Sequence, residues 1–157
     1  INGAAYGGGC ELAAALDFIY VSETARFAQT ETKLGIIPGA GGTQNLSRAV
    51  GEKRAMELIL SGAVFSARDA VEWGLANAIF KPDELMDAAL KAAWKIANNA
   101  PIAVRQAKQA IHKGLQMGLL DGIAFEIEAY NRTISTEDRR EGVLAFNEKR
   151  KAVFKGE

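Results

Sequence analysis

The sequence predicts an α/β first half followed by a helical second half. Up to Pro82, short runs of β-branched and aromatic residues alternate with Ala- and Leu-rich stretches and glycine-bearing loops, which is typical of alternating strands and helices. After Pro82, apolar residues recur every three or four positions, which is typical of amphipathic helices. With 157 residues, 48% hydrophobic and 24% charged, the composition indicates a globular protein and excludes a disordered one.

Strands and helices of the first half are separated by glycines. We expect strands at residues 1–7, 18–23, 26–31 and 75–80. We expect helices at residues 10–17, 43–51, 52–62 and 66–74, the last with Ser66 as its N-cap. Glycines end the last three of these helices, at Gly51, Gly62 and Gly74. Residues 34–44 are predicted to be a loop, because a proline and several glycines could hardly share a helix interior.

The second half contains four consecutive helical patterns. They cover residues 83–99, 101–117, 119–134 and 136–151. In the second of them, the apolar stripe consists of Val104, Ala107, Ile111 and Leu115. Such a run of amphipathic helices packs either on a partner subunit or on its own domain, and the pattern leaves both open.

Charge and cysteine content exclude several classes of protein. Lys plus Arg and Asp plus Glu both number 19, so no net field attracts the chain to nucleic acid or to a membrane surface. No apolar stretch approaches the roughly 20 residues that a membrane span needs. The single cysteine, Cys10, cannot form an internal disulfide. Because the sequence lacks an initial Met and opens on a buried-strand pattern, we expect it to be the C-terminal part of a longer chain.

Three consecutive glycines, Gly7, Gly8 and Gly9, lead directly into the first predicted helix. Glycines at this position expose main-chain N–H groups at the positive end of a helix, where they can bind an oxyanion or a phosphate. Glu11 lies three residues after Gly8, on the same helix face and among apolar neighbours. Two interpretations remain open: a site built on main-chain N–H groups, or tight strand-to-helix packing with an ordinary first-turn glutamate.

A second glutamate, Glu31, precedes the glycine-bearing loop 34–44. If the chain returns to the first glycines, two carboxylates face one small site, where they could bind a water and move its protons in opposite senses. The only histidine, His112, lies on a predicted helix far from any nucleophile, which argues against a histidine-dependent triad or metal site. Lys149 belongs to a basic stretch whose interleaved acids indicate a solvated face, with a bound phosphate as a second interpretation and nucleic acid as a third.

The segments around both glutamates resemble the crotonase family, and the enoyl-CoA hydratases in particular. The resemblance starts with INGAAYGGGCELAAALDFIYVSETARFAQTETKLGIIPGAGGTQNLSRAVG and continues through SGAVFSARDAVEWGLANAIF to TEDRREGVLAFNEKRKAVFKGE. It implies a partial ββα spiral core over residues 1–95 and a helical trimerisation region over residues 96–157. It also implies a homotrimer or homohexamer, in the bacterial cytoplasm or the mitochondrial matrix.

The resemblance also implies roles for individual residues. Glu11 and Glu31 match the two catalytic glutamates of the family, and Gly8 matches the oxyanion-hole N–H donor. Gly39 matches a glycine that shapes the site beside the second glutamate. Lys149 matches a lysine near the phosphates of coenzyme A, in its own site or in that of a neighbouring subunit. Tyr130 is a looser match, to an aromatic residue that flanks the same pocket.

The implied reaction is the reversible syn addition of water to a trans-2-enoyl-CoA thioester, giving a 3-hydroxyacyl-CoA in fatty-acid or branched-chain acyl-CoA degradation. The family needs no metal and no redox cofactor, because coenzyme A arrives with the acyl-CoA substrate. Alternatives within the resemblance are an enoyl-CoA isomerase, a methylglutaconyl-CoA hydratase that also binds RNA, and a fragment that assembles without catalysis. The zero net charge argues against the RNA-binding alternative, and no membrane association is expected.

Overall fold

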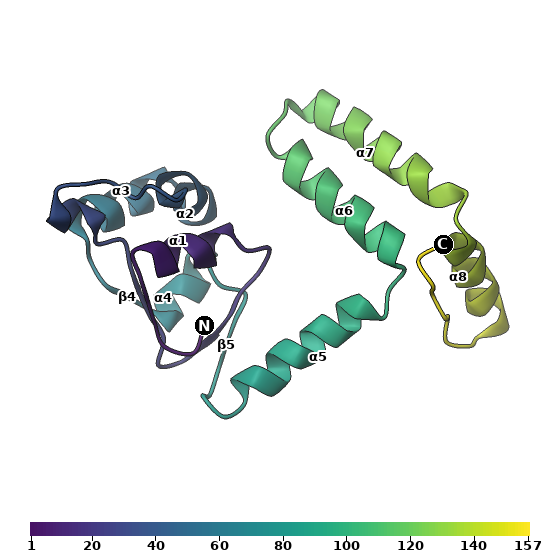
Figure 1. The fold of residues 1–157 in the computed structure, drawn as a ribbon, viewed down its shortest axis with the longest axis horizontal. Helices are drawn as coiled ribbons and strands as arrows, with labels where there is room; N and C mark the ends of the chain where they lie inside the picture. The colour runs from purple at the N-terminus through teal and green to yellow at the C-terminus, as the bar shows by residue number, and fades with distance from the viewer. The chain divides into compact units, whose positions relative to one another are not determined.

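The computed structural model describes residues 1–157, which divide into two compact units, Ile1–Leu90 and Lys91–Glu157. All five strands belong to the first unit, and the second unit is built from helices (Figure 1). The predicted order, an α/β half followed by a helical half, is therefore confirmed. No helix combines the length and the apolar character that crossing a membrane would require.

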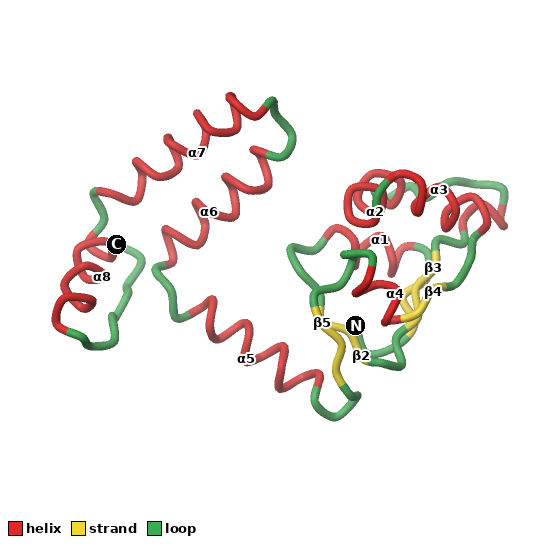
Figure 2. The backbone as a smooth tube through the Cα atoms, turned by 180° about the vertical axis from the view of Figure 1, so that it is seen from behind, coloured by secondary structure: helices red, strands yellow, loops and turns green.

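The strands of the first unit form two small sheets (Figure 2). In one sheet, β1 (Ala4–Tyr6) runs parallel to β3 (Arg26–Ala28), which pairs antiparallel with β4 (Phe65–Ser66). In the other, β2 (Tyr20–Ser22) runs parallel to β5 (Ala78–Phe80). Because β1 and β3 are parallel and in direct register, their carboxyl ends lie side by side, and so do the segments that follow them.

Five helices complete the first unit. They are α1 (Gly8–Ala15), the short 3₁₀ helix η1 (Glu31–Leu34), α2 (Gly42–Val50), α3 (Glu52–Ser61) and α4 (Ala67–Glu72). Their buried side chains pack with those of the strands into one core, in which Phe27, Leu46 and Val21 are fully buried and Phe65 nearly so. Phe27 and Phe65 oppose each other on β3 and β4, and their rings stack with centroids 5.3 Å apart.

The structure differs from the sequence-based expectations mainly at element ends. α1 begins at Gly8 rather than at residue 10, because two of the glycines adopt helical geometry. The expected strand 26–31 ends at Ala28, and Glu31 instead begins η1. β4 has only two residues, too few to show a period in the sequence. The predicted N-cap is confirmed, because Ser66 Oγ accepts the N–H of Asp69 at 3.2 Å. The Asp69 carboxylate in turn accepts the N–H of Ser66, which completes a capping box.

In the second unit, α6 (Pro101–Gly114) and α7 (Leu119–Ile134) lie side by side as a helical hairpin (Figures 1 and 2). They approach closely at a pair of glycines: a Cβ placed on Gly122 would lie 3.2 Å from the carbonyl oxygen of Gly114. α5 (Leu85–Ala97) spans the boundary between the units, and α8 (Glu137–Glu148) follows α7.

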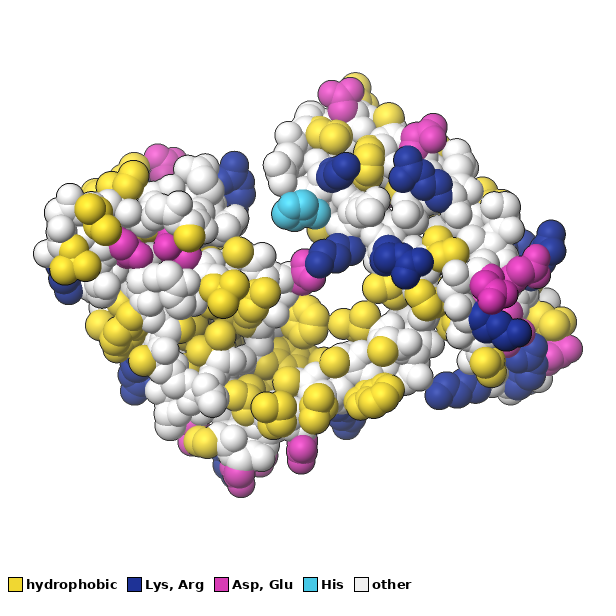
Figure 3. Space-filling model, in the orientation of Figure 1, with side chains coloured by type: hydrophobic (Ala, Val, Ile, Leu, Met, Phe, Trp, Pro, Cys, Tyr) yellow, Lys and Arg dark blue, Asp and Glu magenta, His cyan; other side chains and the backbone are white.

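Large apolar side chains remain exposed on the helices of the second half. On α5, Met86 and Trp94 are 66% and 67% exposed, and Figure 3 shows hydrophobic side chains along this helix. At the turn between α6 and α7, Leu115 and Leu120 are 83% and 81% exposed. Isolated exposed leucines are ordinary, but a series of them over consecutive helices is typical of a surface that contacts another protein.

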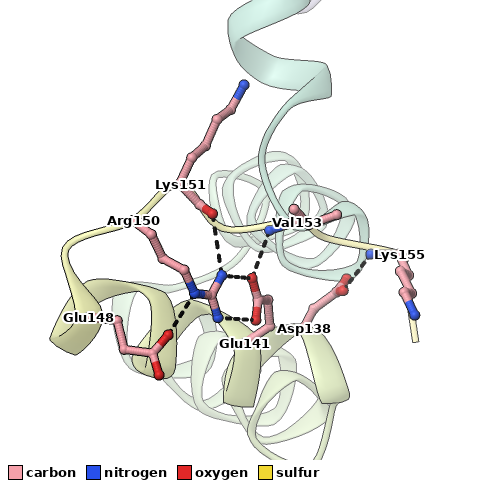
Figure 4. Close-up of polar contacts among 7 residues, drawn as sticks. All are labelled: Asp138, Glu141, Glu148, Arg150, Lys151, Val153 and Lys155. Carbon is pink, nitrogen blue, oxygen red and sulfur yellow. Dashed lines mark hydrogen bonds and ion pairs between the residues drawn. The ribbon is translucent and has the colours of Figure 1, made fainter.

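The last residues of the chain are bound to α8 by two carboxylates (Figure 4). Asp138, which is 3% exposed, accepts the main-chain N–H groups of Lys155 at 2.7 Å and Gly156 at 2.8 Å. Glu141 accepts two bonds from the guanidinium of Arg150, at 2.6 and 2.9 Å, and the N–H of Val153 at 2.8 Å. These bonds to Arg150 and Val153 lower the pKa of the Glu141 carboxyl to about 2.

We expect Asp138→Asn to release this final segment from α8. The amide would place an NH₂ group against a main-chain N–H, and losing a hydrogen bond to a charged acceptor costs about 2 kcal/mol. Amide hydrogen exchange of residues 155 and 156 should therefore become at least about tenfold faster. Glu137→Gln, at the exposed neighbouring position, is the control. Unchanged exchange in Asp138→Asn would show that the segment is held by other contacts.

Candidate active site

The turn between β1 and α1 is built on a glycine that no other residue could easily replace. Gly7 has a φ of 54° and a ψ of −125°, and L-residues with a side chain rarely adopt this conformation. Its N–H donates to the carbonyl oxygen of Ala28 at the end of β3, at 2.9 Å. The turn is therefore attached to the neighbouring parallel strand, whose continuation leads to Glu31.

Gly8, the predicted oxyanion-hole donor, is the first residue of α1 and is exposed. The first N–H groups of a helix have no partner within the helix, and they lie at the positive end of its dipole. A Cβ placed on Gly8 would meet nothing within 4 Å, so the space beside this residue is open. A ligand oxygen can thus approach the main chain at this point.

Glu11 is buried in the first turn of α1, with only 4% of the residue exposed. Its Oε1 accepts two main-chain N–H groups, from Ala40 at 2.7 Å and from Gly42 at 2.9 Å. N–H groups can only donate, so Oε1 serves as an acceptor and neither bond uses Oε2. Oε2 is therefore the oxygen of Glu11 that is left for a ligand or a proton.

Gly42, the first residue of α2, allows this contact because it has no side chain. A Cβ at this position would lie 2.7 Å from the amide of Gln29, 2.8 Å from Cβ of Pro38 and 2.9 Å from Cγ of Glu11. Three neighbours on three different segments thus close around one glycine. The helix α2 can approach α1 and β3 this closely only with glycine here.

Glu31 is the first residue of η1 and is 9% exposed. Its Oε1 would lie 3.3 Å from a Cβ placed on Gly7, so the carboxylate lies against the glycine turn that precedes α1. Glu31 thus contacts the first residue of the segment Gly7–Glu11, and Glu11 is its last residue. The parallel pairing of β1 and β3 brings the segments that follow the two strands together, and Glu31 reaches the turn before Glu11 in this way.

Gln29 lies between the two glutamates and is fully buried. With its amide nitrogen oriented towards Glu31, as the hydrogen bonding requires, it donates to Oε2 at 3.1 Å and to Oε1 at 3.2 Å. The other side of the same amide faces Gly42, whose N–H binds Glu11. Gln29 therefore binds the carboxylate of Glu31 directly and packs against Gly42, the residue whose N–H binds Glu11.

Cys10 lies in the same buried region, with no exposed surface. Burial raises the pKa of its thiol to about 12. The thiol is therefore protonated at neutral pH. A thiolate nucleophile is excluded by this environment.

The remaining predicted site residues are not part of this cluster. Gly39 is exposed in the loop before α2, and a Cβ there would meet only the carbonyl oxygen of Ile37, at 4.0 Å. Tyr130, 64% exposed on α7, and Lys149, the exposed C-cap of α8, belong to the second unit. His112 is exposed on α6. No group of three or more His, Cys, Asp or Glu side chains could hold a metal ion.

Sequence reasoning missed Gln29 and the main-chain donors Ala40 and Gly42. The sequence held one signal for Gln29: in the expected strand 26–31 it shares a side with Glu31, although the strand in the structure ends at Ala28. Nothing in the sequence indicates which of the loop glycines would bind a carboxylate.

The α/β core followed by helices matches solved structures with the crotonase fold. The sequence matches the enoyl-CoA hydratase/isomerase family over residues 1–157. The chain therefore belongs to this family.

Individual relatives agree with this assignment. The crystal structure of enoyl-CoA hydratase from Bacillus anthracis is 50% identical and superimposes with a TM-score of 0.98, over 100% of this chain and 61% of that one. The short-chain-enoyl-CoA hydratase of Clostridium acetobutylicum is 48% identical over 96% of this chain and 58% of its own length. The mitochondrial enoyl-CoA hydratase of Pongo abelii is 47% identical over 99% of this chain and 53% of its own length. The chain thus spans between half and two thirds of the length of these relatives.

We expect Gly42→Ala to destabilise the first unit, whereas Gly39→Ala should be nearly neutral. The new methyl group at residue 42 collides with the rigid ring of Pro38 and with two buried side chains, and overpacking of this kind costs about 1–3 kcal/mol. At residue 39 the methyl group has room. Thermal and urea unfolding of the two variants measure the difference. Equal stability would show that the loop can move away from α1 at no cost.

Proposed function

We propose that the full-length protein carrying this chain is an enoyl-CoA hydratase, which adds water reversibly and with syn geometry to a trans-2-enoyl-CoA thioester to form a 3-hydroxyacyl-CoA. The observation that supports it most is the pair of buried carboxylates, Glu11 and Glu31, at the two ends of the segment Gly7–Glu11. Each is held by different partners, so the two can take different roles around one water molecule.

The first role belongs to the main chain. The thioester carbonyl oxygen of the substrate gains negative charge as water adds, and the N–H of Gly8 can donate to it from the start of α1. Donors fixed in the backbone need no rearrangement as this charge develops, which is why they stabilise the transition state more than mobile water does.

The second role is proton movement by the two glutamates. Glu11 removes a proton from the water through Oε2, and the water oxygen bonds to the β-carbon of the enoyl group. Glu31 gives its proton to the α-carbon, so the carbon–carbon double bond becomes a single bond. The pair holds one proton before and after the step, which has moved from Glu31 to Glu11, and exchange with solvent restores the start. The two sites are coupled, so their protons are counted for the pair.

Hydration is favoured over isomerisation because both glutamates are present. Family members with only the second glutamate usually catalyse double-bond isomerisation, whereas addition of water needs a base for the water as well as a donor for carbon. Relatives of this chain also include a 2,3-dehydroadipyl-CoA hydratase of Escherichia coli and a mitochondrial methylglutaconyl-CoA hydratase of Mus musculus, 43% and 45% identical. These names differ in acyl group and share the reaction.

Coenzyme A is part of the substrate in this proposal, and no metal or redox cofactor enters the reaction. Lys149 and Tyr130 are proposed to contact the coenzyme A moiety, and Gly39 to shape the loop beside Glu31. One basic residue beside Lys149 has acidic partners: Arg150 pairs with Glu141 and Glu148. This pairing argues against a nucleic-acid surface at Arg150, because its charge is already balanced by two carboxylates and adds little to the neutralisation of phosphates.

The helices after residue 95 are proposed to assemble copies of the protein into trimers or hexamers. The exposed apolar side chains where α6 leads into α7 support this proposal, because a surface of this kind is typically covered by another chain.

Hydration of crotonyl-CoA by the full-length protein tests the proposed function. The absorbance of the enoyl-thioester should fall with the wild type, and Glu11→Gln and Glu31→Gln should each lower kcat by about 100- to 10,000-fold, because each removes a proton-transfer group. Glu23→Gln, at an exposed position of the same unit, should leave kcat unchanged. A wild type that leaves the absorbance constant, or glutamine variants that hydrate normally, would refute the proposal.

A further inference from the structure

Glu31 begins a helix that is too short to be stable by itself. η1 has four residues, Glu31–Leu34, which amounts to little more than one turn of 3₁₀ helix. The hydrogen bonds of such a turn have poor geometry, and the side chain of Thr30 at its N-cap makes no capping bond. The turn ends at Gly35, in the left-handed conformation with a φ of 76°. The position of the Glu31 carboxylate therefore depends on contacts outside η1.

Two neighbours of Glu31 make such contacts, and both bind the end of α3. Thr32 Oγ1 donates to the carbonyl oxygen of Ile59 at 2.9 Å. Lys33 Nζ donates to the carbonyl oxygen of Gly62 at 2.7 Å. Both bonds link η1 to residues about 30 positions later in the sequence, and α3 itself is anchored in the core by buried Ala55, Leu58 and Ile59.

The lysine also packs along α3 with its carbon chain. A Cβ placed on Gly62 would lie 2.6 Å from Cε of Lys33, 3.1 Å from Cδ and 3.2 Å from Cγ. The stem thus lies flat over a residue that has no side chain. The ammonium group meets the C-terminal end of the helix, where unpaired carbonyls and the helix dipole favour a cation. Packing of the stem and the charge of the ammonium group both favour this position of Lys33, although the residue is exposed.

We propose that Lys33 is a positioning residue for Glu31. It holds η1 against α3, so that the carboxylate of Glu31 stays beside Gly7 and within reach of the Gln29 amide on the other side of the turn. Lys33 acts through this contact and not on the reacting atoms, because its Nζ is directed to Gly62. Thr32 is the second anchor of the same turn. The catalytic part of this inference rests on the proposed hydratase function.

The test compares Lys33→Met with Lys53→Met in the full-length protein. Methionine keeps most of the carbon stem and removes the cation, and Lys53 is an exposed lysine on α3 itself. A displaced catalytic group costs up to about 100-fold in rate, so Lys33→Met should lower kcat by about 10- to 100-fold, with KM within about twofold. Lys33→Arg should restore most of the rate, and Lys53→Met should match the wild type.

A double variant separates positioning from general damage. In the Glu31→Gln background, Lys33→Met should have almost no further effect, because its action passes through the carboxylate that has been removed. Thr32→Val provides a second way to loosen η1 and should lower kcat in the same direction. Wild-type kcat in Lys33→Met, or an equal loss with and without Glu31, would overturn the inference.

Amide hydrogen exchange tests the anchoring role of Lys33 without depending on the enzyme activity. Amide exchange of residues 31–36 should be faster in Lys33→Met than in Lys53→Met, whether or not the protein hydrates crotonyl-CoA. If the wild type proves inactive, the proposed function fails, and faster exchange still supports the anchoring role of Lys33. Unchanged exchange overturns that role in either case.

Discussion

The two hydrogen bonds from Ala40 and Gly42 to Glu11 Oε1 are the interaction on which the rest of the site depends. They join α1 to the start of α2 and the loop before it, about 30 residues later in the chain. The burial of a carboxylate is costly unless its oxygens are hydrogen-bonded, and main-chain N–H groups provide these bonds without adding a second charge. The bonds require Gly42 to pack directly on Glu11, and the Gln29 amide packs against the same glycine.

The two glutamates are supported differently, and the difference is chemically useful. Glu11 is bound by rigid main-chain donors at one oxygen, whereas Glu31 is bound by a side-chain amide and lies on a short helix attached to α3. The backbone of Glu11 belongs to a regular helix and needs no further anchor. Glu31 needs the contacts of Thr32 and Lys33, because a single 3₁₀ turn has little stability of its own.

Much of the fold could be predicted from the sequence, because strands and helices are local patterns. The glycine-ended helices and the N-cap at Ser66 depend on residues a few positions apart, and the structure has them where they were expected. β4 and η1 could not be predicted in this way. They are too short to show a period, and they exist because Phe65 pairs with Phe27 and because η1 packs on α3.

By itself, the sequence determined that the chain is an α/β unit followed by helices, and that Gly8, Glu11 and Glu31 are the residues to examine. Their types and local spacing contain that information. Only the tertiary structure decided which groups hold the carboxylates. Gly42 and Lys33 bind partners about 30 residues away in the sequence, and Gln29 packs against Gly42 from a third segment, so these contacts depend on how the strands and helices pack together. A local sequence pattern gives no information about the distance between two segments that come together only when the chain folds.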